Sequence, residues 1–316
     1  MKAAKTILIS GGTGLVGTAL TKFLKEGGWN IIVLTRNPNL AYRKFGNKSG
    51  ISFAAWDIKK GTIDAHAVAS ADALVHLAGS GIVDKPWTEA YRREIRESRV
   101  NSSRLLVQAI RDHGSKLTTV VSASAIGWYG ADDPEHMVAF TEDMPAAPGF
   151  LGETCLDWEN SIKPVMELDK RLIICRFGIV LSNHGGALRE FKKPLAFRVA
   201  GILGSGSQIV SWIHISDLCG IIQFAIEQEN LQGVYNAVAP HPVSNKVLNL
   251  ALAECIYGKG FMTMPVPEIF LKIFFGERSA EVLKSTTVSA EKILSTGFAF
   301  QFPDIHAAVK NLASGK

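Results

Sequence analysis

The chain has 316 residues, of which 47% are hydrophobic and 20% charged, a balance typical of a folded globular protein and unlike a disordered one. Its formal net charge of +5 is dispersed without a run of like charges, which argues against a nucleic-acid or membrane surface. The four cysteines form no C-x-x-C pair, so neither a disulfide framework nor a metal site is expected. The apolar run Ile7–Ile9 is too short for a signal peptide, and no stretch approaches the ~20 apolar residues of a membrane span. We expect a soluble, cytoplasmic protein.

The first half of the chain alternates short β-rich runs with helical patterns. Strands are predicted at residues 6–10, 30–35, 51–56, 73–78, 117–122 and 172–177, and helices at residues 15–25 and 88–113. This alternation predicts an α/β fold of the Rossmann type, a doubly wound parallel sheet with helices on both faces.

After about residue 181 glycines and prolines become frequent. Helical patterns recur at residues 246–256, 268–274 and 280–283, and strands are predicted near residues 210–213 and 233–236. We interpret residues 1–181 as the dinucleotide-binding domain and residues 182–316 as mainly a smaller C-terminal substrate lobe, from which some segments return to the first domain.

A glycine-rich loop directly follows the first predicted strand and opens the first predicted helix. In this context a G-x-x-G-x-x-G spacing favours a dinucleotide site over an ordinary glycine turn, because backbone N–H groups at a helix N-terminus hold phosphates. The predicted cofactor-binding residues of the loop are Gly11, Thr13, Gly14, Leu15, Val16 and Gly17.

The second predicted strand ends in Thr35-Arg36-Asn37 and carries no acid that would hold the 2′-hydroxyl of NAD. Arg36 can pair with a 2′-phosphate, so we expect NADP(H); the alternative is a solvent-facing charge. Asp57 can accept from the adenine amino group or cap a turn. After the fourth strand, Leu77, Ala78 and Gly79 let the backbone pass close to the dinucleotide.

Several motifs together resemble extended short-chain dehydrogenases/reductases, the group with the nucleotide-sugar epimerases and dehydratases. They are GGTGLVG (11–17), VHLAG (75–79) and SASAIGWYG (122–130). Further motifs are similar to the subgroup called epimerase family proteins, some labelled cell-division-inhibitor-like: RFGIVLSNHGGAL (176–188), GSGSQIVSWIHISDL (204–218), NAVAPHPVSN (236–245) and FGERSAEVL (275–283). The resemblance covers nearly the whole chain and implies the fold and the cofactor, but no substrate.

The resemblance implies a catalytic Ser or Thr after the fifth strand, which matches Ser124; the alternative is a strand-end serine bonded to backbone. It also implies a Tyr-x-x-x-Lys pair on the next helix. Aligned on FLGETCLDWE, Leu151 stands in place of the Tyr and Cys155 in place of the Lys. Neither side chain can reproduce a tyrosine whose pKa is tuned by an ammonium group.

Other residues could replace the missing proton donor. Tyr129 follows Ser124 closely but could equally pack against the sheet end. Glu153 lies on the same helix as Cys155, two residues before it, and could be a buried acid or an exposed helix residue. His214 titrates near neutrality but could be a core histidine, and Cys155 is more often a small buried residue than a nucleophile.

Substrate contacts are predicted from residues of both parts of the chain. If residues 208–214 form a strand, Gln208, Trp212 and His214 share one face. A structural ion pair is an equal alternative for Arg176 and Arg278, and a packing role is the alternative for Trp87 and Trp212. The predicted substrate residues are Trp87, Arg176, Gln208, Trp212 and Arg278.

Two functions follow from these features. The first is an NADP(H)-dependent oxidoreductase or epimerase acting on a small polar molecule. The second is a non-catalytic NADP(H)-binding regulator or scaffold, motivated by the absent Tyr and Lys. A homodimer through residues 89–113 is a further possibility.

Overall fold

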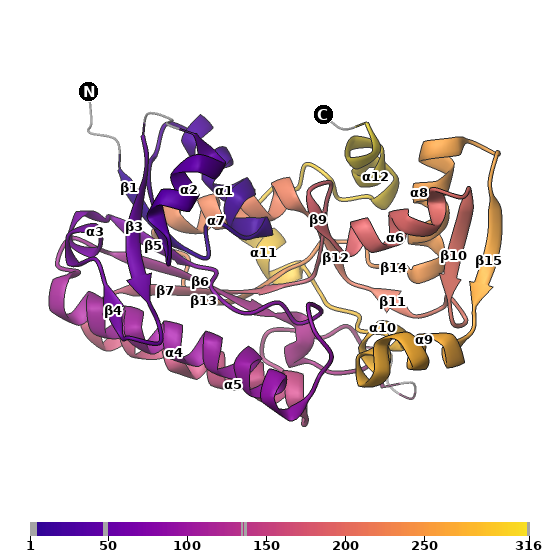
Figure 1. The fold of residues 1–316 in the computed structure, drawn as a ribbon, viewed down its shortest axis with the longest axis horizontal. Coiled ribbons are helices and arrows are strands. Elements are labelled where there is room, and N and C mark those ends of the chain that lie inside the picture. The colour runs from indigo at the N-terminus through magenta and orange to yellow at the C-terminus, as the bar shows by residue number, and fades with distance from the viewer. Residues whose placement is uncertain (1–4, 47–49, 134, 136–137, 315–316) are drawn as a thin grey trace.

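The structure, a computed structural model, describes residues 5–46, 50–133, 135 and 138–314. Within these ranges an eight-stranded sheet forms the first part of the molecule (Figure 1). From one edge to the other its strands are β13 (Gly233–Ala237), β7 (Arg171–Phe177), β6 (Thr119–Ala125), β5 (Ala73–His76), β1 (Thr6–Ser10), β2 (Asn30–Thr35), β3 (Ile51–Asp57) and β4 (Thr62–Ile63). All neighbours pair in parallel except the last two. The predicted doubly wound α/β fold is confirmed.

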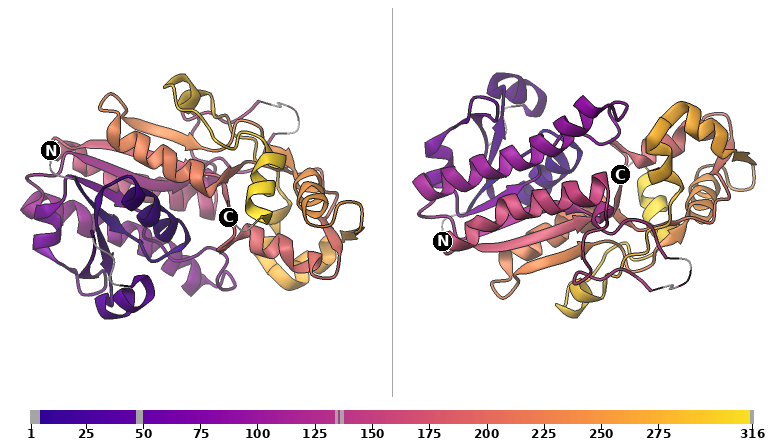
Figure 2. Two further views of the ribbon diagram at one scale, coloured as in Figure 1. Left: turned by 90° about the horizontal axis from the view of Figure 1, so that it is seen from above. Right: turned by 90° about the horizontal axis from the view of Figure 1, so that it is seen from below.

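Both faces of this sheet are covered, which explains the nearly continuous apolar strands. On one face Ile7 and Ile9 of β1 pack with residues of the helices α1 and α7. On the other face Leu8 packs with residues of α4. The helices of this part are α1 (Leu15–Glu26), α2 (Pro38–Phe45), α3 (Ala65–Ser70), α4 (Glu89–His113), α5 (Phe150–Ile162) and α7 (Ile215–Glu227), with short turns η1 (Ile126–Trp128) and η2 (Lys163–Leu168). Figure 2 shows α4 and α5 side by side beneath the sheet.

The second lobe contains three small sheets and its own core. In one sheet β8 (Ile179–Ser182) lies between β12 (Trp212–His214) and β9 (Gly185–Gly186); β10 (Val199–Leu203) pairs with β15 (Met262–Val266), and β11 (Ile209–Val210) pairs with β14 (Val243–Ser244). The fully buried Trp212 lies in the core of this lobe. The helices of this lobe are α6 (Ala187–Leu195), α8 (Asn245–Tyr257), α9 (Glu268–Phe275), α10 (Ser279–Leu283) and α12 (Ile305–Ala313), with the turn η3 (Gly276–Arg278). The helix α11 (Glu291–Ser295) instead packs against β13, and its Ile293 belongs to the core of the large sheet.

The strand predicted at residues 233–236 is present as β13, which extends the large sheet beside β7. Three of the other strand predictions need correction. The strand predicted at residues 73–78 ends at His76. The strand predicted at residues 210–213 is two strands in different sheets, and Ser211 at the break hydrogen-bonds to the backbone of Thr286 and Val288. The strand predicted at residues 117–122 instead runs over Thr119–Ala125, because each of its residues pairs with β7.

No helix in the described part of the chain is long and apolar enough to cross a membrane.

Candidate functional site

The carboxyl ends of β1, β2, β5 and β6 meet at one edge of the large sheet, and the glycine loop lies there. Gly11 has a φ of +70°, and a Cβ on it would lie 2.6 Å from the carbonyl carbon of Leu77. A Cβ on Gly17 would lie 2.3 Å from the carbonyl oxygen of Gly11. The loop is therefore pressed between the end of β5 and the first turn of α1, which only glycine permits at these positions.

The N-terminus of α1 has no side-chain cap among the described residues. Gly14 is its N-cap residue, and the backbone N–H of Gly14 donates to the carbonyl oxygen of Gly11 at 3.0 Å. Gly14 and Thr13 are exposed, while Leu15 and Val16 are half-buried. The side chain of Leu15 lies against Gly186 of β9, where a Cβ would be 3.0 Å from it. The second lobe thus reaches the edge of the loop.

The junction of β2 and α2 leaves Arg36 facing solvent. Asn37 caps α2 through a 3.0 Å hydrogen bond from the backbone N–H of Leu40. Arg36 is exposed and forms no ion pair with any described residue. Its guanidinium is available to an incoming anion.

Asp57 ends β3 in a turn. Its Oδ1 accepts hydrogen bonds from the backbone N–H groups of Lys59 and Lys60, at 2.9 and 3.2 Å. Asp57 therefore caps a turn, which was one of the two alternatives considered for it. Both of these hydrogen bonds are accepted by Oδ1, and Oδ2 takes no part in them.

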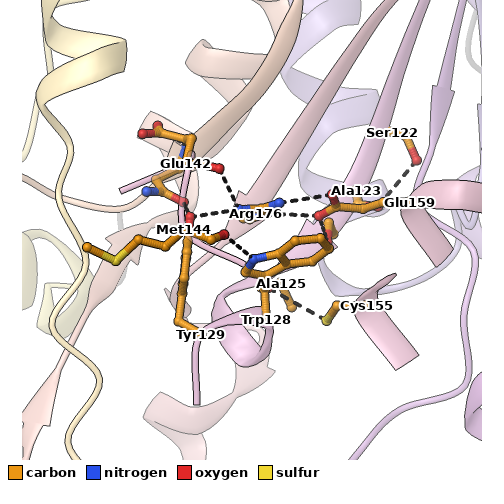
Figure 3. Close-up of polar contacts among 12 residues, drawn as sticks. Ser122, Ala123, Ala125, Trp128, Tyr129, Glu142, Met144, Cys155, Glu159 and Arg176 are labelled. Carbon is orange, nitrogen blue, oxygen red and sulfur yellow. Dashed lines mark hydrogen bonds and ion pairs between the residues drawn. The ribbon is translucent and has the colours of Figure 1, made fainter. Parts of the chain in front are cut away.

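A buried polar network joins β6, β7 and α5 (Figure 3). Ser124 donates its hydroxyl hydrogen to Oε1 of Glu159 at 2.7 Å. Arg176 donates to both oxygens of the same carboxylate, at 2.8 Å from Nε and 3.0 Å from Nη2. Arg176 and Glu159 are 2% and 1% exposed, so this ion pair is shielded from water. Ser124 lies within the strand and is bound to a carboxylate rather than to backbone.

The network continues through Tyr129 towards β13. The phenol accepts from Nη1 of Arg176 at 2.9 Å and donates to Oδ1 of Asn236 at 2.6 Å. The guanidinium carbon of Arg176 lies 3.7 Å from the centre of the Trp128 ring. Glu142 completes the connection, since its carboxylate accepts from the backbone N–H of Asn236.

The electrostatics of this network favour neutral Tyr129 and charged Arg176. Burial raises the pKa of Tyr129, and the nearby Arg176 only partly opposes this. Burial alone would lower the pKa of Arg176, but its hydrogen bonds to Glu159 outweigh this and raise it. Tyr129 therefore holds its proton near neutral pH and does not reproduce a tyrosine tuned for proton transfer.

The positions of the missing Tyr and Lys are packed beneath η1. Gly127 faces the side chains of Leu151 and Cys155, which a Cβ would approach to 3.3 and 3.9 Å. Burial and the neighbouring Glu159 raise the pKa of the Cys155 thiol to about 11, although Arg99 opposes this. Cys155 is therefore a neutral, buried thiol, as one alternative anticipated.

Two other candidates have structural contacts. Glu153 is exposed, and its carboxylate accepts from the backbone N–H of Gly149 at the start of its own helix. His214 is buried and is the N-cap residue of α7: its Nδ1 accepts from the backbone N–H of Ser216 at 3.0 Å. Its Nε2 contacts Oδ1 of Asn311 at 3.2 Å. Burial lowers the pKa of His214 to about 4, so the imidazole is neutral.

The predicted substrate residues do not gather in one place. Trp212 is in the core of the second lobe, and the side-chain amide of buried Gln208 donates to the carbonyl oxygen of Leu203. Gln208 precedes β11, so the assumed strand of residues 208–214 does not exist. By contrast, Trp87 and Arg278 do lie near each other, where the two lobes meet.

That meeting point is formed by the segment before α4 and by η3. Arg278 donates to the carbonyl oxygen of Val83 at 2.8 Å, and Glu277 pairs with Arg92. The guanidinium of Arg92 lies over both rings of an edge-to-face aromatic pair, Trp87 and Phe150. These contacts hold the lobes together beside the carboxyl edge of the sheet.

Glu159, His76 and Asn236 were not among the residues predicted from the sequence. Glu159 follows Cys155 by four residues, so a charged residue on the buried stripe of α5 was a detectable signal. His76 at the end of β5 is fully buried between Ser10 and Ser103, and burial lowers its pKa to about 3. Nothing in the local sequence of Asn236 indicated its contact with Tyr129, because the two are 107 residues apart.

The sheet order, the glycine loop and the second lobe define a dinucleotide-binding fold of the short-chain dehydrogenase/reductase type. Residues 7–149 match the NAD dependent epimerase/dehydratase family, and residues 266–312 match a domain of unknown function, DUF1731. An epimerase family protein of Staphylococcus aureus (strain MRSA252) is 33% identical over 98% of this chain and 99% of its own length. The chain therefore belongs to the same family as these epimerase family proteins.

Solved structures support the same assignment. The crystal structure of human epimerase family protein SDR39U1 (isoform 2) with NADPH has a TM-score of 0.83 and 27% identity, and the match covers 98% of this chain and all of that one. A nucleoside-diphosphate sugar epimerase from Corynebacterium glutamicum has a TM-score of 0.77 and 31% identity over 99% of this chain and 59% of its own. MoeE5 in complex with UDP-glucuronic acid and NAD, at 19% identity, shares the fold.

The buried ion pair predicts a large loss of stability when one charge is removed. Glu159→Gln keeps the size of the side chain but leaves Arg176 buried without its counter-charge, which should lower the free energy of unfolding by about 3–5 kcal/mol. Chemical denaturation measures this. The exposed Glu167→Gln is the matched control and should change stability by less than about 0.5 kcal/mol. A loss below about 1 kcal/mol for Glu159→Gln would contradict the network described above.

The buried histidines predict acid sensitivity. His76 and His214 have pKa values near 3 and 4 in the folded chain and about 6.5 when unfolded, so below pH 6.5 only the unfolded chain takes up their protons. The contribution of the two histidines to the free energy of unfolding is fully present above pH 6.5. As the pH falls towards 4 this contribution should decrease, by about 1.4 kcal/mol per pH unit for each histidine.

His214→Asn isolates one of these histidines, because asparagine also caps a helix well but does not titrate. Denaturation at a series of pH values should give a shallower slope for this variant than for the unchanged chain. The exposed His113→Gln should leave the slope as it is. Parallel curves for His214→Asn and the unchanged chain would show that His214 does not contribute.

Proposed function

We propose that the chain binds NADP(H) across the carboxyl edge of the large sheet. The observation that carries the proposal is the glycine loop, in which Gly11 and Gly17 have no room for a side chain and α1 begins without a side-chain cap. Such a loop presents backbone N–H groups to a pyrophosphate. The NADPH in the human relative's crystal structure supports the same choice.

The preference for the phosphorylated coenzyme rests on Arg36. Its exposed guanidinium stands at the end of β2, the position where an acidic residue selects NAD by binding the ribose 2′-hydroxyl. A planar guanidinium suits a 2′-phosphate, with which it forms charge-assisted hydrogen bonds. The contribution of Asp57 to adenine binding stays a prediction.

Arg36→Ala should therefore weaken NADPH binding by about 10- to 100-fold, the equivalent of one or two charge-assisted hydrogen bonds. NADH serves as the internal control, because it lacks the 2′-phosphate and its affinity should not change. Titration followed by nicotinamide fluorescence or calorimetry measures both. An equal loss for the two coenzymes would show that Arg36 does not select between them.

We infer that the bound coenzyme serves an oxidoreductase or epimerase reaction on a small polar molecule. Members of the epimerase/dehydratase family match the first half of this chain, and the C. glutamicum relative is a nucleoside-diphosphate sugar epimerase. The coenzyme would supply or accept the hydride. Ser124, which ends the buried network close to the carboxyl end of β6, is the residue proposed to position the reacting oxygen.

One observation favours a second function, a non-catalytic NADP(H)-dependent regulator or scaffold. Leu151 and Cys155 leave the family's proton-transfer positions without a titratable group at neutral pH, and the hydroxyl of Ser124 donates to Glu159. A protein of this kind would bind NADPH and change its affinity for a partner protein. Dimerisation through α4 stays a prediction under either function.

Turnover separates the two functions. We expect a panel of carbonyl compounds and sugar nucleotides, assayed with NADPH or NADP⁺, to include a substrate whose turnover falls by about tenfold or more in Ser124→Ala. Ser122→Ala is the matched control, because this buried serine lies two residues earlier on the same face of β6 and donates to the carbonyl oxygen of Ala123. NADPH binding without turnover of any compound, together with a partner retained only with NADPH, would favour the regulator.

A further inference from the structure

Arg99 is a buried cation without a carboxylate partner among the described residues. This residue of α4 is 8% exposed. Its Nη1 donates to the carbonyl oxygens of Ser80 and Ile95, at 3.0 and 2.9 Å. Burial lowers its pKa, and no ion pair offsets this cost. A charge in such a place is expensive to keep unless something else compensates it.

The opposite edge of the guanidinium consists of Nε and Nη2, and Gly79 lies beside Nε, since a Cβ on it would be 3.3 Å away. In the described part of the chain no hydrogen bond is found for Nε or Nη2 of Arg99. Neither atom is among the fully enclosed polar atoms that lack a partner. This edge therefore retains access to solvent, and two nitrogen atoms can donate to a bound molecule.

The packing around Arg99 fixes the position of this edge. The indole ring of Trp158 lies 5.0 Å from the guanidinium carbon, and a Cβ on Gly79 would be 3.1 Å from the same carbon. The hydroxyl of Ser98 accepts from the backbone N–H of Ser80 at 3.0 Å, which ties the loop after β5 to α4. Arg99 is thus held before any ligand arrives, which lowers the entropic cost of binding.

Arg99 lies on the side of the site opposite to Arg36. It packs against Gly79, which follows the residues Leu77 and Ala78 that touch Gly11 of the phosphate loop. Its charge also acts on Cys155, whose pKa it lowers against the effect of burial. Position 155 is where the family resemblance implies a lysine. A cation therefore lies close to the expected place, but it comes from α4 instead of α5.

We propose that Arg99 binds the nicotinamide-ribose half of the dinucleotide through its open edge. The proposal rests on the NADP(H)-binding function given above. A dinucleotide whose 2′-phosphate is at Arg36 and whose pyrophosphate is at the loop after β1 extends its other half over β5 and β6, where Arg99 lies. A guanidinium fork can donate to ribose hydroxyls or phosphate oxygens at once. The coenzyme is then held by an arginine at each end.

Two probes test this proposal: NADPH and adenosine 2′,5′-bisphosphate, which has the 2′-phosphate and the adenine but no nicotinamide half. Arg99→Gln should weaken NADPH binding by at least about tenfold, the loss of one charge-assisted hydrogen bond, and leave the bisphosphate within about twofold. Arg104→Gln is the matched control. This exposed arginine lies five residues further along α4 and should change neither affinity.

Each outcome decides the matter. Unchanged NADPH affinity in Arg99→Gln, or an equal loss for both probes, overturns the proposal. If Arg99→Gln does not fold, Arg99→Lys takes its place, because lysine keeps the positive charge but not the guanidinium fork. This variant should lose affinity for NADPH but not for the bisphosphate. An unchanged ratio of these two affinities again overturns the proposal. If the unchanged chain binds neither probe, the proposed NADP(H) function itself fails, which is a distinguishable result.

Discussion

The ion pair of Arg176 and Glu159 is the interaction on which the geometry of the candidate site depends. Removing both charges from water is costly, and the structure offsets the cost with two parallel hydrogen bonds, the hydroxyl of Ser124 and the Trp128 ring. The pair fixes α5 against the carboxyl ends of β6 and β7. Through Tyr129 the same guanidinium reaches Asn236, so the edge strand β13 is also held in register with the site.

The ion pair lies beside the two positions where the family resemblance implies a Tyr and a Lys. Leu151 and Cys155 stand at these positions and pack beneath η1. Glu159, one turn further along α5 than Cys155, forms the ion pair with Arg176 of β7. With Arg99 of α4, the residue proposed to bind the coenzyme, the charged groups of the candidate site come from three different elements.

The local features of the fold were predictable from the sequence. The spacing of the glycines and the apolar runs of β1, β2 and β7 correctly predicted these strands and the glycine turn between β1 and α1, because these signals involve residues close together in the chain. The position of Asn236 beside Tyr129 was not predictable, since it depends on a strand that joins the sheet after a long excursion through the second lobe. For the same reason the polar contacts of His214 with Asn311 came only from the structure. Glu153 was the only glutamate of α5 considered from the sequence, although the spacing of Glu159 from Cys155 indicated a second one on the buried side of the helix.

The elements β13 and α7 come after residue 181 in the chain but belong to the large sheet and its helical cover. The chain therefore cannot be cut into two structural units at that residue. A fragment that ended at residue 181 would contain the phosphate loop but would lack the strand that completes the sheet beside β7 and the helix that covers α1. Ile173 and Cys175, both enclosed in the complete chain, would then face water. The large sheet and its helical cover are therefore incomplete until the chain has been synthesised as far as the end of β13 at Ala237.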